Sequence, residues 1–484
     1  MKIRIYHILL TLLLAGCNDF LEEKSQDRVR PSTVSDLEQL LLGEGYVSSH
    51  NLYNCTWYLT DDVQSNGVSF DQAQELHDTY KWLFTWNEQM FTDAGAGFDG
   101  AFYQAPYKGI LGCNLILDNL DEMDGIDRLR ENLRGEALTL RAWYYFHLVN
   151  LFGIAYNQGN PSSDLGVPLK LDSSVTGEYF TRNTVGEVYA RIERDLLEGN
   201  RLLKAYDYNR GYFRMGHLAA KAILSRMYLY MEEWDKALAY ADSVLMEKSA
   251  LLDLNTVGWE GSLNAWKKVF SPTAPDEIIW ARNMPASQGD VLLAIGPFTP
   301  SEDLLGTYRK ATISDYYAQQ VHDIRGIVSF AWDMDFLGTF MNFRQTVRKS
   351  DDMGEDHGIR TAELYLNRAE VYARKYLASG DASFRQAALA DLNKLRKARF
   401  NSVYYEDIDI TDGQELLDFC LEERRRELCA ESNHRWCDLR RFGKTVTHVL
   451  QESNASTEYV KDMSRYVLPL QDEIMVWNPW LVQN

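Results

Sequence analysis

The sequence has few basic residues: 50 Lys and Arg stand against 70 Asp and Glu, and the formal net charge is -20. Nucleic-acid binding needs clustered Lys and Arg to face phosphates. The one basic cluster, "ERRRE" at Glu423 to Glu427, is bounded by acids. The composition therefore predicts no nucleic-acid partner.

Metal-binding and catalytic motifs are also scarce. The chain has no CxxC, no Cys/His spacing typical of zinc and no HExxH, so neither a zinc site nor a zinc protease is expected. No Ser or Cys stands in a recognisable nucleophile context. We expect no cofactor and no metal ion.

Long apolar runs are missing as well, and the N-terminal one is too short to span a bilayer, which takes about 20 residues. Lys2 and Arg4 precede the run Ile8 to Ala15, which is the layout of an export signal. The pattern predicts a signal peptide at residues 1–16.

The motif "LAGC" ending at Cys17 resembles a bacterial lipobox, in which cleavage leaves a lipid-bearing cysteine as the first residue. This predicts lipidation of Cys17 and, since more than one acyl chain gives stable attachment, a membrane anchor. A plain secretory signal is the alternative. The acidic run after Cys17 resembles signals that send lipoproteins to the outer face of the outer membrane.

No Pro/Gly/Ser-rich linker divides the chain, although its length alone would suggest about three domains. We expect a flexible tether at residues 17–35 and a single domain at 36–484, beginning with a helix capped by Ser35. Five cysteines remain besides Cys17, an odd number. The one disulfide that we would name is Cys55 with Cys113.

Long, alanine-rich amphipathic segments at 131–153, 213–246 and 360–400 predict a mostly helical fold. The second fits part of the tetratricopeptide pattern, and the third repeats it with a turn at 379–381. The pattern positions are Leu224, Tyr228, Ala237 and Ala241, then Leu366, Tyr372 and Ala387. Irregular insertions at about 154–183 and 251–355 interrupt the helices. Loops carried on a rigid scaffold are common binding sites.

Several pieces in this order resemble the SusD/RagB family of surface nutrient-binding lipoproteins. The resemblance runs nearly end to end and is carried by "LAGCNDFLE" (14–22), "TDD" (60–62), "YKGILGCNLILDNLD" (107–121), "LRAWYYFHLVNLFG" (140–153), "GVPL" (166–169), "LNRAEVYAR" (366–374), "EERRRELCAESNHRWCDLRRFG" (422–443) and "LPLQDEIMVWNPWLVQN" (468–484).

The resemblance implies a SusD-like α-α superhelix of tetratricopeptide-like helix pairs with large loops. It also implies a binding protein without catalysis that acts as a lid for a SusC-like TonB-dependent transporter. The implied ligand is an oligosaccharide or, in the RagB branch, a peptide. Attachment to the outer membrane through Cys17 suits a lid facing the exterior.

Within the piece 422–443, charged pairs four residues apart are expected to support a helix: Glu422 with Arg426, and Glu431 with Arg435. The family usually has a glycine after the residue matching Glu431. Here Ser432 and Asn433 follow, and Asn tolerates a left-handed turn.

A glycan site combines exposed aromatic rings with polar side chains, and two loop regions offer this mixture. The candidate ligand-binding residues are Asp61, Asn66, Phe70, Tyr80, Trp82, Phe298 and Trp332. Core packing is the alternative for Trp82 and Trp332, and it is expected of Trp86. A cap or turn role is the alternative for Asp61.

Two other functions compete. A surface glycoside hydrolase needs two carboxylates. Because the chain has 70 acidic residues, the presence of carboxylates does not indicate a catalytic pair. A tetratricopeptide scaffold for protein partners does not explain the lipobox. The glycines of "GAGFDG" (95–100) follow no buried strand, so they do not predict a dinucleotide site. The acidic loops 351–358 and 406–413 lack regular calcium-loop spacing and are expected to be solvated turns.

Overall fold

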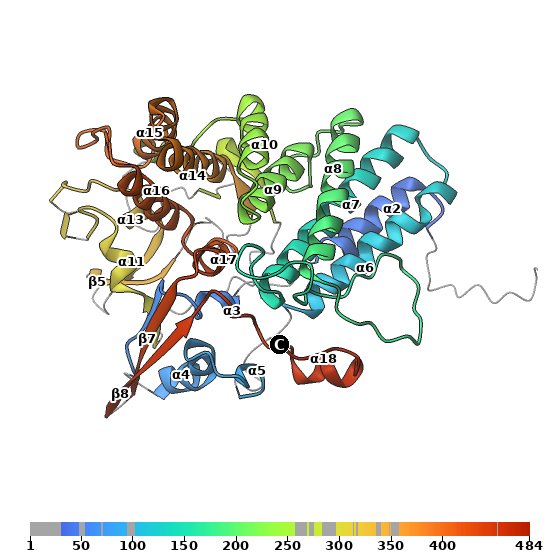
Figure 1. Cartoon of the computed structure of the whole chain (residues 1–484), viewed down its shortest axis with the longest axis horizontal. Coiled ribbons are helices and arrows are strands. Elements are labelled where there is room, and N and C mark those ends of the chain that lie inside the picture. The colour runs from blue at the N-terminus through green and yellow to red at the C-terminus, as the bar shows by residue number, and fades with distance from the viewer. Residues whose placement is uncertain are drawn as a thin grey trace, which may run out of the picture.

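The computed structural model describes residues 31–47, 54–68, 71–93, 102–256, 269–270, 275–282, 297–312, 314–315, 318–334, 340–347, 349, 358–452 and 454–484. Figure 1 shows the long helices side by side across the upper part of the molecule, with the β7–β8 hairpin, α4, α5 and α18 below them. The described part of the chain is mostly helical, as the sequence predicts.

The helices are α2 (Val34–Leu40), α3 (Asn54–Trp57), α4 (Asp71–Phe84), α5 (Met90–Asp93), α6 (Gln104–Asn119), α7 (Asp127–Phe152), α8 (Val185–Ala205), α9 (His217–Tyr230), α10 (Trp234–Glu247), α11 (Glu302–Gly306), α13 (Arg325–Val328), α14 (Thr361–Ser379), α15 (Ala382–Lys397), α16 (Gly413–Leu428), α17 (His434–Arg441) and α18 (Asp472–Trp477). Shorter turns are a π-helix at Leu41–Gly45 and 3-10 turns at Leu120–Glu122, Leu254–Thr256 and Pro275–Glu277.

The strands of the described residues form antiparallel pairs. They are β1 (Val63–Ser65) with β3 (Phe298–Pro300), β2 (Ile278–Ala281) with β6 (Gly358–Arg360), β4 (Phe330–Met334) with β5 (Phe340–Val347), and β7 (Thr445–Glu452) with β8 (Ala455–Asp462). The first two pairs join the second insertion to other parts of the chain. β4 and β5 both lie within that insertion, and β7–β8 is a local hairpin.

Both predicted helix pairs are confirmed: α9 contacts α10, and α14 contacts α15. Ala237 and Ala241 are buried on α10, where their small side chains let α9 approach closely. The second turn depends on Gly380, whose φ of 70° is a left-handed conformation that glycine adopts without steric cost. Because α8 contacts α9 and α10 contacts α14, the pairs stack into one continuous scaffold.

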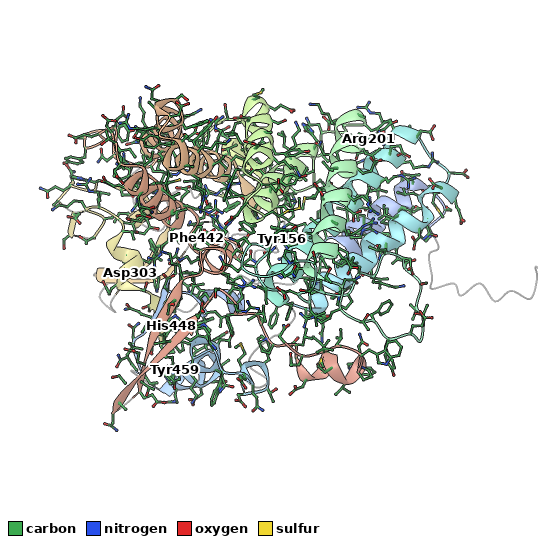
Figure 2. All side chains as sticks on the ribbon, viewed as in Figure 1. Tyr156, Arg201, Asp303, Phe442, His448 and Tyr459 are labelled. Atoms are coloured by element: carbon green, nitrogen blue, oxygen red, sulfur yellow. The ribbon has the colours of Figure 1, made fainter. Side chains whose placement is uncertain are left out.

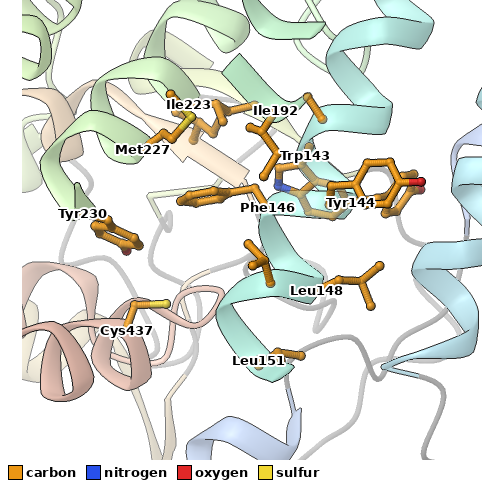
Figure 3. Packing of buried hydrophobic residues seen from close by; sticks show 14 of the residues in the cluster. Trp143, Tyr144, Phe146, Leu148, Leu151, Ile192, Ile223, Met227, Tyr230 and Cys437 are labelled. Carbon is orange, nitrogen blue, oxygen red and sulfur yellow. The ribbon is translucent and has the colours of Figure 1, made fainter. Parts of the chain in front are cut away.

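The main core lies along α7, whose residues from Ala137 to Phe152 are all buried. Figure 3 shows Trp143 and Phe146 of α7 beside Ile192 of α8 and Ile223 of α9. Burial on nearly all faces means that α7 is enclosed by its neighbours. It is therefore the central helix of the N-terminal half.

The first described helix begins earlier than expected. Its N-cap is Thr33, not Ser35, and Thr33 and Asp36 form a reciprocal capping box. The Thr33 hydroxyl accepts from the Asp36 N–H, while the Asp36 carboxylate accepts from the Thr33 N–H. Asp36 at the third helical position is the signal that distinguishes the two candidates.

The piece 422–443 is not one helix. Leu428 ends α16 and His434 begins α17, and the left-handed residues are Ala430 and Ser432, with φ of 52° and 49°. Asn433 could tolerate a left-handed conformation, but its φ is -118°, and Ser432, at the position where the family usually has glycine, is the left-handed residue.

One of the two predicted ion pairs in this piece forms. Arg426 contacts Glu422, but Glu431 does not pair with Arg435. Because the chain turns between them, Glu431 instead accepts from Lys349 at 2.8 Å, and Arg435 reaches Asp61.

Charged side chains fill the space between α16, the end of α15 and the second insertion. The members are Glu277, Asp323, Glu423, Glu427 and Glu431 with Arg325, Lys349, Arg360 and Arg399, all buried. Arg399 Nη2 lies 2.8 Å from both Glu277 and Glu427. Since a buried charge is tolerated only with a partner, this network fixes the insertion to the scaffold.

The expected Cys55–Cys113 disulfide does not form, because Cys113 carries a free, buried thiol. Burial raises the pKa of the Cys113 thiol, which keeps it protonated and unreactive. Among the described residues, no helix is both long and apolar enough to cross a membrane.

Candidate functional site

The two regions predicted to bind a ligand meet in the structure, and most of the first is the helix α4. β1 and β3 pair in antiparallel register, with Ser65 opposite Phe298 and Val63 opposite Pro300. Segments more than 230 positions apart in the sequence therefore share one edge of the molecule. Figure 2 marks this edge by Asp303 on α11 and by His448 on β7.

Asp61 lies at the base of this edge and is held by the scaffold. Its two carboxylate oxygens accept from Nε and Nη2 of Arg435 at 2.7 and 2.6 Å. Burial raises the pKa of Asp61, but the hydrogen bonds and charge of Arg435 outweigh burial and lower that pKa below its ordinary value. Asp61 is therefore ionised at neutral pH.

Asp62 is fully buried and accepts from Nε of Arg425 at 2.7 Å. The same guanidinium donates to Asp303 through Nη1 at 2.6 Å, so Arg425 joins β1 to α11. Burial raises the pKa of Asp62, against the attraction of Arg425 and Arg435. The Arg425 and Arg435 partners were missed from the sequence, because no local spacing links residues so far apart.

Asn66 is exposed and follows β1. Its backbone N–H donates to the carbonyl of Pro297 at 2.8 Å, and its Nδ2 donates to Thr299 Oγ1 at 2.7 Å. Its Oδ1 accepts from Gln64 at 3.1 Å. An exposed carboxamide already held in place can exchange further hydrogen bonds with a ligand at little entropic cost.

Aromatic rings line the inner side of the same edge. Tyr80 stacks on Tyr58 with ring centroids 4.4 Å apart, and the Phe298 ring meets Tyr58 edge-on at 5.8 Å. Tyr80 and Trp82 are half-buried on α4, and the Lys81 ammonium lies 5.0 Å from the Trp82 ring. Both rings keep part of their surface open to a ligand.

Phe298 differs from these two, because only 7% of it is exposed. Its ring packs against Phe84 with centroids 5.0 Å apart and stacks on His77 at 5.8 Å. Phe298 therefore supports the aromatic layer from within the core. Trp86 is buried as expected and donates from its indole to the carbonyl of Leu59 at 3.1 Å.

His448 on β7 is a supporting residue that sequence reasoning missed. Its ring lies between those of Phe84 and Trp86, with centroids 4.0 and 4.1 Å away. Nδ1 lies 2.6 Å from the carbonyl of Phe84, and Nε2 lies 2.9 Å from that of Thr60. Burial lowers the pKa of His448, although the two carbonyls and Asp61 oppose that shift.

The remaining predicted residues are not placed. Cys17, Phe70 and the glycines of 95–100 lie outside the described residues, and so does the side chain of Trp332, whose backbone forms part of β4. Their roles stay predictions.

The acidic loop 406–413 holds no cluster of ligands. Asp409 pairs with Arg385, and Asp412 caps α16 by accepting from Glu415 N–H at 2.8 Å. Across the part of the chain that the structure describes, no group of three or more His, Cys, Asp or Glu side chains could hold a metal ion.

Comparison with known families defines the class of protein. A SusD-like model described as "Starch-binding associating with outer membrane" matches residues 19–229, and the SusD family model matches residues 315–484. Together they span most of the chain, so the class is that of outer-membrane-associated binding proteins. The chain belongs to the SusD/RagB family.

Curated relatives include two proteins of Formosa agariphila. SusD-like protein P38 is 24% identical over 436 residues, which cover 78% of each chain. SusD-like protein P2 is 24% identical over 539 aligned positions, covering 100% of this chain and 99% of the relative. The chain thus matches its relatives over most of their length.

Solved structures share the fold. A SusD superfamily protein from Bacteroides thetaiotaomicron superposes with a TM-score of 0.68 at 20% identity, covering 93% of this chain and 99% of that one. A putative sugar binding protein from Bacteroides vulgatus gives 0.67 at 24% identity, covering 94% and 99%. A SusD-like carbohydrate binding protein from the same species gives 0.64 at 20%, covering 93% and 97%. The predicted SusD-like fold is confirmed.

Proposed function

We propose that the protein captures oligosaccharides at the cell surface, without cleaving them, and delivers them to a SusC-like TonB-dependent transporter. The observation that carries this proposal is the pairing of β1 with β3, which brings the exposed Asn66 next to Phe298. Phe298 and Tyr58 are buried, and they support the half-buried Tyr80 ring that stacks on Tyr58. Rings that meet the CH faces of a sugar and amides that meet its hydroxyls are the two elements of a glycan site.

The site is also preorganised. Arg425 and Arg435 fix Asp62 and Asp61, the two aspartates that precede β1. The two ring nitrogens of His448 contact the carbonyl of Thr60, before β1, and that of Phe84, at the end of α4. A loop that is already ordered loses less entropy when a ligand binds. Family membership supports binding over catalysis.

Affinity electrophoresis of the full-length protein in gels containing starch, xylan, laminarin or galactomannan tests the proposal. We expect at least one polysaccharide to retard the protein, and Trp82→Ala to weaken that binding about 2- to 10-fold, since an aromatic contact contributes about 0.5–1.5 kcal/mol. The control is Trp480→Ala, which removes a tryptophan that is 59% exposed near the C-terminus and should change nothing.

Two outcomes would contradict the proposal, and a third would revise its site. Release of reducing ends from a bound polysaccharide would indicate a glycoside hydrolase. Binding of peptides in place of every glycan would indicate a RagB-type peptide capture protein. Equal retardation of wild type and Trp82→Ala would remove Trp82 from the site.

We further propose that Cys17 carries the lipid and anchors the protein to the outer membrane, facing the exterior. The family description supports association with that membrane. Radiolabelled palmitate should enter the wild type and the control Asn18→Ala, but not Cys17→Ala. Equal attachment of Cys17→Ala to cells would refute the anchor.

The transporter partnership is tested separately, by purifying the tagged protein from its own membranes in mild detergent. A TonB-dependent transporter should co-purify in a constant ratio. Its absence under conditions that preserve glycan binding would limit the function to capture.

A further inference from the structure

A second concave region lies away from the β1–β3 edge, between α7 and α8 on one side and the start of α9 and end of α10 on the other. It is a cavity of about 690 Å³, within the range of about 300–1,000 Å³ that small-molecule sites occupy. Its wall includes Asn132, Glu136, Tyr212, Met215, Glu247 and Lys248. None of the predicted ligand-binding residues lines it.

Asn132 is the unusual member of this wall. It lies on α7, is only 4% exposed, lines the cavity, and has no side-chain hydrogen bond to any described residue. Because Asn132 lines the cavity and none of its side-chain atoms bonds to a described residue, its donors and acceptor are available to a polar occupant there.

Glu136 lies one turn along α7 from Asn132 and is also buried, but its carboxylate is fully paired. Glu136 accepts from Nη2 of Arg214 at 2.5 Å and also from the hydroxyl of Tyr46. Across the cavity, His217 contacts Glu247 at 2.8 Å. Both signs of charge line the cavity, with Arg210, Arg214 and Lys248 beside Glu136, Asp207, Glu247 and Asp276. Since neither sign dominates, the wall suits a neutral ligand better than an ion.

Further donors face the same space. α9 starts at His217 after Gly216, which provides no side-chain cap, so the first backbone N–H groups of the helix keep their hydrogen-bonding capacity. The Lys248 ammonium forms no ion pair with any described residue, and Lys248 lines the cavity. Met215 and Ile278 supply apolar wall, and the Tyr212 ring is half-buried beside them.

We propose that this cavity is a second binding site, for a neutral mono- or disaccharide. Adjacent hydroxyls of the sugar bond to the Asn132 carboxamide, and the amides at the start of α9 and Lys248 donate to other hydroxyls. The Tyr212 ring meets the apolar face of the sugar. The site is separate from the β1–β3 edge, so it can hold a sugar whether or not that edge binds glycans.

Isothermal titration of the full-length protein in detergent with glucose, galactose, mannose, xylose, maltose and cellobiose tests the proposal. At least one sugar should bind, and Asn132→Ala should weaken it about tenfold, the effect of losing paired hydrogen bonds at one side chain. Gly216→Trp should abolish binding, because a side chain there meets no atom within 4 Å and extends into open space.

Matched controls separate this site from the other. Asn200→Ala changes an asparagine of α8 that does not line the cavity, and Trp82→Ala changes a candidate glycan-binding residue on α4; both should bind the sugar as the wild type does. The proposal is overturned if no sugar binds at about 1 mM, if Asn132→Ala and Gly216→Trp bind normally, or if Trp82→Ala alone abolishes binding.

Discussion

Asp61 and Arg435, which lie 374 positions apart, form a two-point contact in which Nε and Nη2 of the guanidinium meet both carboxylate oxygens at 2.7 and 2.6 Å. The parallel geometry of a guanidinium and a carboxylate makes such contacts the strongest of their kind. This one fastens the segment before β1 to α17. The candidate binding edge is therefore mounted on the helical scaffold.

Removing Arg435 should destabilise the protein more than removing Asp61. Arg435→Gln leaves the Asp61 carboxylate, 28% exposed, without its main partner. We expect the free energy of unfolding in urea to fall by about 1.5–3 kcal/mol. Asp61→Asn keeps one acceptor and removes the charge, so its effect should be smaller.

Arg201→Gln is the control, since Arg201 is 61% exposed and its ion pair with Glu198 lies at the surface. Exposed pairs contribute little, and a change within about 0.5 kcal/mol is expected. Equal effects of Arg201→Gln and Arg435→Gln would show that the Asp61 contact is not structural.

Replacing His448 by phenylalanine should loosen the candidate site while keeping the ring stack. The phenyl ring can still lie between Phe84 and Trp86, but the carbonyls of Phe84 and Thr60 lose their ring partner. We expect the free energy of unfolding to fall by about 1–3 kcal/mol, the cost of unsatisfied buried groups, and glycan affinity to fall with it.

His322→Phe is the matched control. His322 also stacks on a ring, that of Tyr404, at 4.4 Å, but its imidazole makes no hydrogen bond within the described structure. Its replacement should leave both stability and affinity nearly unchanged. If His322→Phe and His448→Phe behave alike, the carbonyl contacts of His448 have no role.

The scaffold could be predicted from the sequence because its signals are local. Small residues such as Ala237 and Ala241 recur at helical spacing, and Gly380 ends α14 where a left-handed residue is required. Each of these features depends on a few neighbouring positions. The helix pairs were therefore located correctly, and the start of the first helix, α2, was missed by two residues, at Thr33 in place of Ser35.

The candidate site was predicted only in outline, because its contacts are long-range. Nothing near Asp61 in the sequence indicates Arg435, and the pairing of β1 with β3 joins two short, irregular segments. Buried Phe298 and half-buried Trp82 are both aromatic residues of the two candidate regions, so composition does not separate them. Asn132 looks like any helical asparagine until its surroundings are known.

Glu370 should make the free energy of unfolding depend on pH in the acidic range. Its carboxylate is buried between Arg441, which donates twice at 2.7 Å, and Arg374. Burial opposes ionisation, but the charge and hydrogen bonds of Arg441 prevail and lower the pKa of Glu370 from 4.5 to about 2. A carboxyl with a lowered pKa contributes stability above its unfolded pKa and loses it as pH falls.

The wild type should thus be more stable than Glu370→Gln by about 3 kcal/mol at neutral pH, and the difference should shrink between about pH 4.5 and pH 2. Urea unfolding at a series of pH values measures it. Glu458→Gln, which changes an exposed glutamate on β8, should show no such trend. A difference for Glu370→Gln that stays constant with pH would contradict the assignment.

Ser432 occupies a position suited to glycine. Its φ of 49° is left-handed, which costs an L-residue about 1–2 kcal/mol relative to glycine, and its hydroxyl makes no hydrogen bond to a described residue. Ser432→Gly should raise the free energy of unfolding by about 1 kcal/mol, after the added freedom of the unfolded chain is subtracted. Ser243→Gly, inside α10, should instead lower it by about 0.5–1 kcal/mol. If both substitutions destabilise the protein in thermal and urea unfolding, the turn between α16 and α17 is not strained at Ser432.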